Sequence, residues 1–85
     1  MELKDTSILM SSENYKNRFK AEYIQTKIRY EKLHKMLVKS KAGTLSFKPS
    51  CDIALLTEQA GYMGRYLECL EVRAEIENIN LDSIQ

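Results

Sequence analysis

The stretch FKAEYIQTKIRYEKLHKML, residues 19–37, decides the fold. Apolar and neutral side chains recur in it at alternating steps of four and three residues, a spacing that places them on one side of an α-helix. We call this side the first seam, and its members are Phe19, Tyr23, Thr26, Tyr30, Leu33 and Leu37.

A second stretch repeats the same steps, and its seam consists of Leu56, Ala60, Met63, Leu67, Leu70 and Ala74. Two long helices with matching seams in 85 residues predict an all-α fold, an antiparallel two-helix hairpin in one domain. The expected division of the domain 1–85 is a leader 1–12 that can form a short helix, a helix 13–41, a connection 42–51, a helix 52–77 and a tail 78–85.

Capping signals support these bounds. Ser11 or Ser12 can cap the first helix, and Ser50 or Asp52 the second. Gly43 suits the left-handed position that ends a helix.

Apolar residues outside the helices are expected to close the two ends of the hairpin. Leu45 and Phe47 alternate with polar residues, so we expect an extended segment that tucks both side chains under one end. At the other end, Asn78 should form the terminal turn, and Ile79 and Leu81 should fold back onto the helix.

The two cysteines are not placed for an intrachain bridge. Cys51 and Cys69 are 18 residues apart, roughly 27 Å along a helix, whereas a disulfide needs Cα atoms within about 7 Å. The sequence also contains no signal-peptide pattern and no apolar run of membrane-spanning length. We therefore expect a reduced, cytoplasmic protein that has no membrane contact.

Charge is divided unevenly along the chain. Residues 1–49 carry eleven Lys and Arg against five Asp and Glu, while residues 50–85 carry two against seven. One interpretation is attraction between a basic and an acidic helix, and another is that the basic helix also meets an anionic ligand. The net charge of +1 argues against a dedicated nucleic-acid-binding protein.

Several apolar residues lie off the seams and would be exposed on an isolated hairpin. A two-helix hairpin buries only one side of each helix, so these residues need the leader segment or another subunit. We expect a homo-oligomer. The residues are Ile24 and Ile28 on the first helix and Leu55, Tyr62, Tyr66, Cys69 and Ile76 on the second.

No residue pattern indicates catalysis, and we expect neither an enzyme nor a cofactor. His34 is the single histidine, so a zinc site is not predicted, and Cys69 has no base beside it. Gly61 and Gly64 lie inside a helix, where each is destabilising. Close helix packing is the favoured explanation of these glycines, and close approach of a ligand is the alternative.

Basic and aromatic residues are interleaved along the first helix and again at Arg65 and Tyr66 in the second. Guanidinium and ammonium groups hold phosphates, and flat rings stack on bases. The candidate ligand-binding residues that the seams leave free are Tyr15, Lys16, Arg18, Arg65 and Tyr66.

Nearly the whole chain, from about residue 5 to 81, resembles a family of small proteins from phages and prophages of gut Firmicutes, related to a small protein of crAss-like phages. The runs RFKAEY and KIRYEKLHKML, the F-x-P-S-C connection and the EQ-x-x-x-M-x-x-Y-L-x-x-LE-x-R tail carry this resemblance. The layout is also similar to the helical hairpin of phage sponge proteins that oppose the CBASS and Thoeris defences.

The sponge likeness implies a counter-defence protein that holds a cyclic nucleotide or cyclic ADP-ribose-type signal in pockets between subunits, without catalysis. Two alternatives stay open at this point. One is a helical inhibitor or adaptor that acts on a host defence protein, and the other is a minor phage structural factor.

Overall fold

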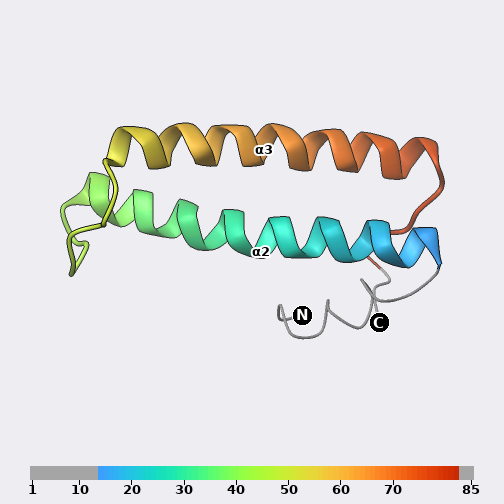
Figure 1. Ribbon diagram of the computed structural model, residues 1–85, viewed down its shortest axis with the longest axis horizontal. Helices are drawn as coiled ribbons and strands as arrows, with labels where there is room; N and C mark the ends of the chain where they lie inside the picture. Colours follow the sequence, from blue (N-terminus) through green and yellow to red (C-terminus); the bar gives the residue numbers. More distant parts are fainter. Residues whose placement is uncertain (1–13, 83–85) are drawn as a thin grey trace.

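The computed structural model describes residues 14–82, and two helices account for most of them. Helix α2 spans Tyr15–Ala42 and helix α3 spans Ile53–Ile76. The two helices lie side by side and run in opposite directions (Figure 1). The predicted all-α hairpin is therefore confirmed. The leader 1–12 with its expected short helix lies outside the described residues.

The first residue of each helix is fixed by a side-chain cap. The Asn14 side chain accepts hydrogen bonds from the backbone N–H groups of Lys16 and Asn17, at 2.8 and 3.3 Å. The prediction that a serine at position 11 or 12 caps this helix was wrong, because Asn14 supplies the acceptor closer to its first turn. Asp52 caps α3 by accepting from the N–H of Ala54 at 3.0 Å.

Both helices end in a left-handed residue, as the sequence predicts. Gly43 has a φ of 76°, and the backbone N–H of Thr44 reaches back to the carbonyl of Lys39. Asn78 has a φ of 57°, and the N–H of Ile79 donates to the carbonyl of Ala74. Each of these hydrogen bonds is the 6→1 bond of a Schellman motif, which satisfies carbonyl groups at the end of a helix and turns the chain across that end.

The core lies between the helices at the end where the chain leaves α3. Its buried residues belong mostly to the two predicted seams. The tail adds Ile79, which is buried, and Leu81, which packs against the core, so the expected fold-back is confirmed. Ile24 and Ile28 were expected to lie off the seam and to need the leader or another subunit, but Ile24 is part of this core and Ile28 packs against it. The buried members are Phe19, Tyr23, Ile24, Leu67, Leu70, Ala74 and Ile79.

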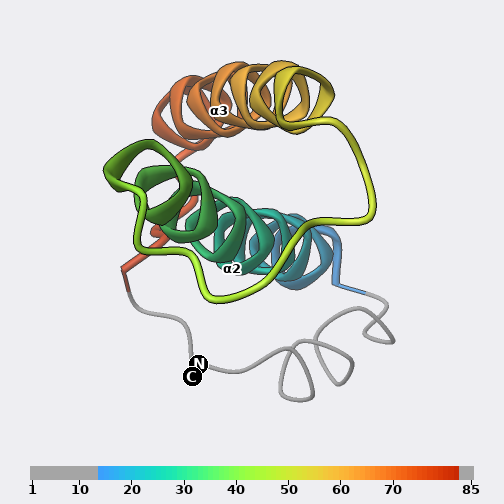
Figure 2. The ribbon, with the colours of Figure 1, turned by 90° about the vertical axis from the view of Figure 1, so that its left-hand side faces the viewer.

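The connection between the helices contributes little to the core. It runs as an open loop from one helix end to the other (Figure 2). Phe47 is 58% exposed, so the expectation that it tucks under the hairpin was wrong. Alternating apolar residues predict an extended segment, but here no neighbouring surface lies over Phe47 to bury it. Cys51 and Cys69 are both exposed and free, as predicted.

Candidate ligand-binding site

Three of the five predicted site residues lie along one edge of the hairpin, which we call the tyrosine edge. Tyr15 and Arg18 share a side of α2 with Glu22, because steps of three and four residues return to the same side of a helix. Tyr66 reaches this side from α3, and its hydroxyl donates a hydrogen bond to Glu22 at 3.1 Å. Burial, followed by the charge of Glu22, raises the pKa of Tyr66.

The hydroxyl of Tyr15 is held in a small polar network. It donates to Glu77 at 2.9 Å and accepts from the Arg73 guanidinium at 2.6 Å. The hydrogen bond to Glu77 raises the pKa of Tyr15. Arg73 also pairs with Glu77 at 3.2 Å and lies over the Phe19 ring, 4.9 Å from its centroid. This network ties the start of α2 to the end of α3, which is a structural role for Tyr15.

The opposite edge of the hairpin carries a groove between the helices, and Tyr30 stands in its middle. The part of the groove nearer the start of α2, which we call its lower part, is a pocket of about 250 Å³. The lining combines one cation with two carboxylates, so charge there is mixed. The lining residues are Tyr23, Lys27, Tyr30, Glu31, Gly64, Leu67 and Glu71.

The part of the groove nearer the end of α2, which we call its upper part, is a pocket of about 180 Å³. The charge of its lining differs from that of the lower part. Its basic members are His34 and Lys41, and none of the described residues that line it is acidic. Much of the wall is apolar, from Leu37, Val38 and Ala60. An anionic ligand with an apolar, flat portion is therefore better matched here than in the lower part.

Tyr30 and His34 form a stacked aromatic pair in the wall of the upper pocket. Their ring centroids are 5.8 Å apart and the ring planes differ by 15°. The two residues are one turn apart on α2, so their rings stand one above the other on the same side. From the sequence, Tyr30 was assigned to the first seam and His34 was given no role. The four-residue step between them was the sequence signal that could have predicted their contact.

The glycines of α3 face this groove in two different ways. A Cβ added to Gly64 would lie 3.5 Å from Cε1 of Tyr30, an ordinary van der Waals contact. At Gly61, no heavy atom of the described residues beyond its own helix backbone lies within 4 Å of an added Cβ. The expectation that both glycines serve close packing is met within the chain only at Gly64, where the neighbour is a side chain.

The two remaining predicted residues, Lys16 and Arg65, lie away from the tyrosine edge. Lys16 precedes Tyr23 by seven residues, two turns, so it lies on the same side of α2 beyond the lower end of the groove. Arg65 precedes Val72 by seven residues and lines neither part of the groove, so it lies on the side of α3 that faces away from α2. Both Lys16 and Arg65 are exposed. The structure thus places three of the five predicted residues on the tyrosine edge and separates Lys16 and Arg65 from them.

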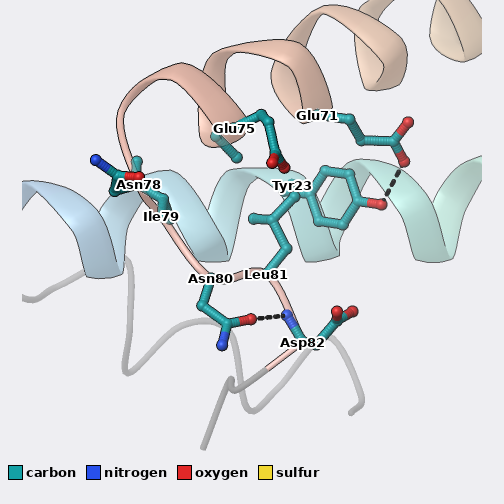
Figure 3. A pocket seen from close by; sticks show the side chains of 9 residues that line it. Tyr23, Glu71, Glu75, Asn78, Ile79, Asn80, Leu81 and Asp82 are labelled. Carbon is teal, nitrogen blue, oxygen red and sulfur yellow. Dashed lines mark hydrogen bonds between the residues drawn. The ribbon is translucent and has the colours of Figure 1, made fainter.

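Another pocket lies under the tail and is poorly suited to an anion. It measures about 480 Å³, and Glu71, Glu75 and Asp82 line it together with Tyr23 (Figure 3). Three carboxylates repel a phosphate. The hydroxyl of Tyr23 donates to Glu71 at 2.6 Å, and burial together with this bond raises the pKa of Tyr23 to about 12.

Two absences within the described residues bear on other functions. Within residues 14–82, no group of three or more His, Cys, Asp or Glu side chains is placed to hold a metal ion. Neither α2 nor α3 is long and apolar enough to cross a membrane.

Comparison with known proteins identifies the family. No curated protein and no solved structure matches the chain. The model of one protein family, described as Sequestin, matches residues 13–76, which cover both helices and the connection between them. Because this match spans well over half of the chain, the protein belongs to the Sequestin family.

Proposed function

We propose that the protein sequesters a small nucleotide-type signal, a cyclic nucleotide or a cyclic ADP-ribose-type molecule, and releases it unchanged. The family name denotes sequestration, which is binding without conversion. The sequence resemblance to small phage proteins supports a setting in the cytoplasm of an infected bacterium. There, removal of a soluble immune signal would counter the host defence.

The observation that carries this proposal is the upper part of the groove. It combines the stacked rings of Tyr30 and His34 with the cation of Lys41, and no described acidic residue lines it. Flat rings stack on bases, and Lys holds phosphates through charge-assisted hydrogen bonds. These are the two kinds of contact that a nucleotide offers.

The tyrosine edge is a less favourable place for the same ligand. The hydroxyls of Tyr15 and Tyr66 already donate to the carboxylates of Glu77 and Glu22. An arriving phosphate would meet these two negative charges. We keep Tyr15, Arg18 and Tyr66 as a proposed second contact surface. Lys16 is proposed to assist binding from the groove side, and Arg65 from the outer side of α3.

We also propose that the protein acts as a homo-oligomer. Large apolar side chains stand on the side of α3 that faces away from α2, and a seven-residue step joins several of them. Ile76 is 74% exposed. Such a strip is typical of a helix that packs against another helix. Its members are Leu55, Tyr62, Cys69, Val72 and Ile76.

The same exposed strip favours a second candidate function. A helical inhibitor or adaptor could lay this side of α3 against a host defence protein, as helices do in apolar grooves. Affinity purification from host lysate would then recover a stoichiometric protein partner and no small molecule. Recovery in purified virions would instead indicate a minor structural factor of the phage.

Calorimetric titration tests the proposed function. The purified protein is titrated with cyclic dinucleotides, cyclic trinucleotides and the cyclic isomers of ADP-ribose. We expect saturable heat with at least one of these, and mass spectrometry after heat denaturation should recover that molecule intact. Absence of heat with every member, or recovery of a cleaved product, would contradict sequestration.

A further inference from the structure

Gly61 occupies a position in α3 that the fold of the single chain does not explain. It lies in the interior of a long helix, where glycine is unfavourable. Gly64, one turn further on, contacts the ring of Tyr30, but Gly61 has no such neighbour. Gly61 is exposed and lines the upper pocket of the groove. Its missing side chain therefore keeps space open in that pocket.

The aromatic pair lies across this space. Tyr30 and His34 line the same pocket from α2, with their rings nearly parallel. Leu37 and Ala60 add apolar wall between the two helices. The pocket thus has two aromatic rings on one helix and bare backbone on the other.

We propose that this space is a base slot, in which the planar base of a nucleotide lies between the Tyr30–His34 rings and the bare backbone at Gly61. The inference rests on the proposed function and names the part of the ligand that the upper pocket recognises. A sugar phosphate without a base would not fill the slot.

The size of the groove places the rest of the nucleotide. Neither pocket alone reaches the roughly 300–1,000 Å³ of a typical small-molecule site, but the two together do. A ligand held in the upper pocket therefore extends past Tyr30 into the lower one. There Glu31 and Glu71 can accept hydrogen bonds from ribose hydroxyls. Phosphates are expected nearer Lys41, which lines the upper pocket.

A leucine at position 61 would fill the slot without disturbing the fold. An added Cβ there meets no described neighbour, and leucine is a better helix former than glycine. Ala54→Leu is the matched control. It adds a leucine to the same side of α3 two turns earlier, at an exposed residue that lines none of the groove.

The test is NMR titration of the full chain with AMP and, separately, with ribose 5-phosphate. AMP should shift the Gly61 amide and the His34 ring signals, and ribose 5-phosphate should leave both in place. Gly61→Leu should weaken AMP binding by about tenfold or more, a loss of the size expected when a base loses one stacking contact. Ala54→Leu should bind AMP as the parent does.

Several results would overturn the base slot. These are equal shifts with ribose 5-phosphate, no shift at Gly61 and His34 with AMP, or unchanged AMP affinity in Gly61→Leu. Dissociation of an oligomer by Gly61→Leu alone would show that the glycine serves packing between copies instead. Tight binding of a cyclic signal combined with any of these results would leave the proposed function standing and remove only the slot.

Discussion

The ring of Tyr30 lies against the bare backbone of Gly64, with 3.5 Å between Cε1 and the place of an added Cβ. This contact sets the middle of the groove, because Tyr30 lines both of its parts. Gly61 lies one turn earlier and leaves the space beyond the ring open. The two glycines therefore have different roles despite their equal cost to the helix.

Replacement of Gly61 by alanine should stabilise the protein. The added methyl meets open space, and alanine is better than glycine inside a helix by about 1 kcal/mol. Gly43→Ala is the contrast, because its φ of 76° should make alanine unfavourable by about 1–2 kcal/mol. Chemical denaturation measures both changes. A loss of stability in Gly61→Ala would mean that its surroundings are not open.

The loss of stability on truncating a leucine to alanine should increase with the burial of that leucine. Leu70 is 3% exposed, so Leu70→Ala should lower the free energy of unfolding by about 2–5 kcal/mol. Leu33 is only half-buried, so Leu33→Ala should cost less. Denaturant midpoints of the two variants provide the comparison. The reverse order, or a Leu70→Ala midpoint equal to that of the parent, would contradict the described core.

Tyr23 should make stability depend on alkaline pH. Its pKa is raised from 10.0 to about 12, so the folded state keeps the proton that the unfolded chain loses. The stabilising contribution is complete below pH 10 and is lost as the pH rises from 10 towards 12. Tyr23→Phe should be less sensitive to pH across this range in urea denaturation. The same pH dependence in parent and variant would assign the effect to other tyrosines.

The fold was predictable because the seams depend only on spacing. Phe19 and Leu67 must face the partner helix in any antiparallel arrangement, so a step pattern is sufficient to find them. The turn at Asn78 was also predictable, since few residues accept its left-handed conformation and Ile79 follows it with an apolar side chain. The burial of Phe47 was predicted wrongly. Alternation of apolar and polar residues does not tell whether another part of the protein lies against the apolar side chains.

The groove was much harder to predict. Tyr30 lies on the edge of the seam, and the direction of its ring depends on the room that Gly64 leaves on the other helix. The stack with His34 follows from that direction. Spacing alone placed Tyr15 among the free aromatic residues, although its hydroxyl bonds with Arg73 and Glu77, 58 and 62 residues away. Contacts of this range are not encoded in a local pattern.

Self-association should depend on the outer strip of α3. If Ile76 is buried between copies, Ile76→Asp would place an unpaired charge in an apolar interface and dissociate the oligomer. Light scattering on parent and variant reports the mass. Val38→Asp is the control, because it adds the same charge to an exposed residue of α2 outside the strip. A monomeric parent protein would end this proposal.

Sequestration itself is tested most directly by one titration, in which the parent and Gly61→Leu are compared against the panel of cyclic nucleotides and cyclic ADP-ribose isomers. The parent should bind at least one member, and the bound molecule should be recovered unchanged after the protein is denatured by heat. Gly61→Leu should bind that member at least about tenfold more weakly, as expected for one lost stacking contact. A parent protein that binds no member of the panel would contradict the account.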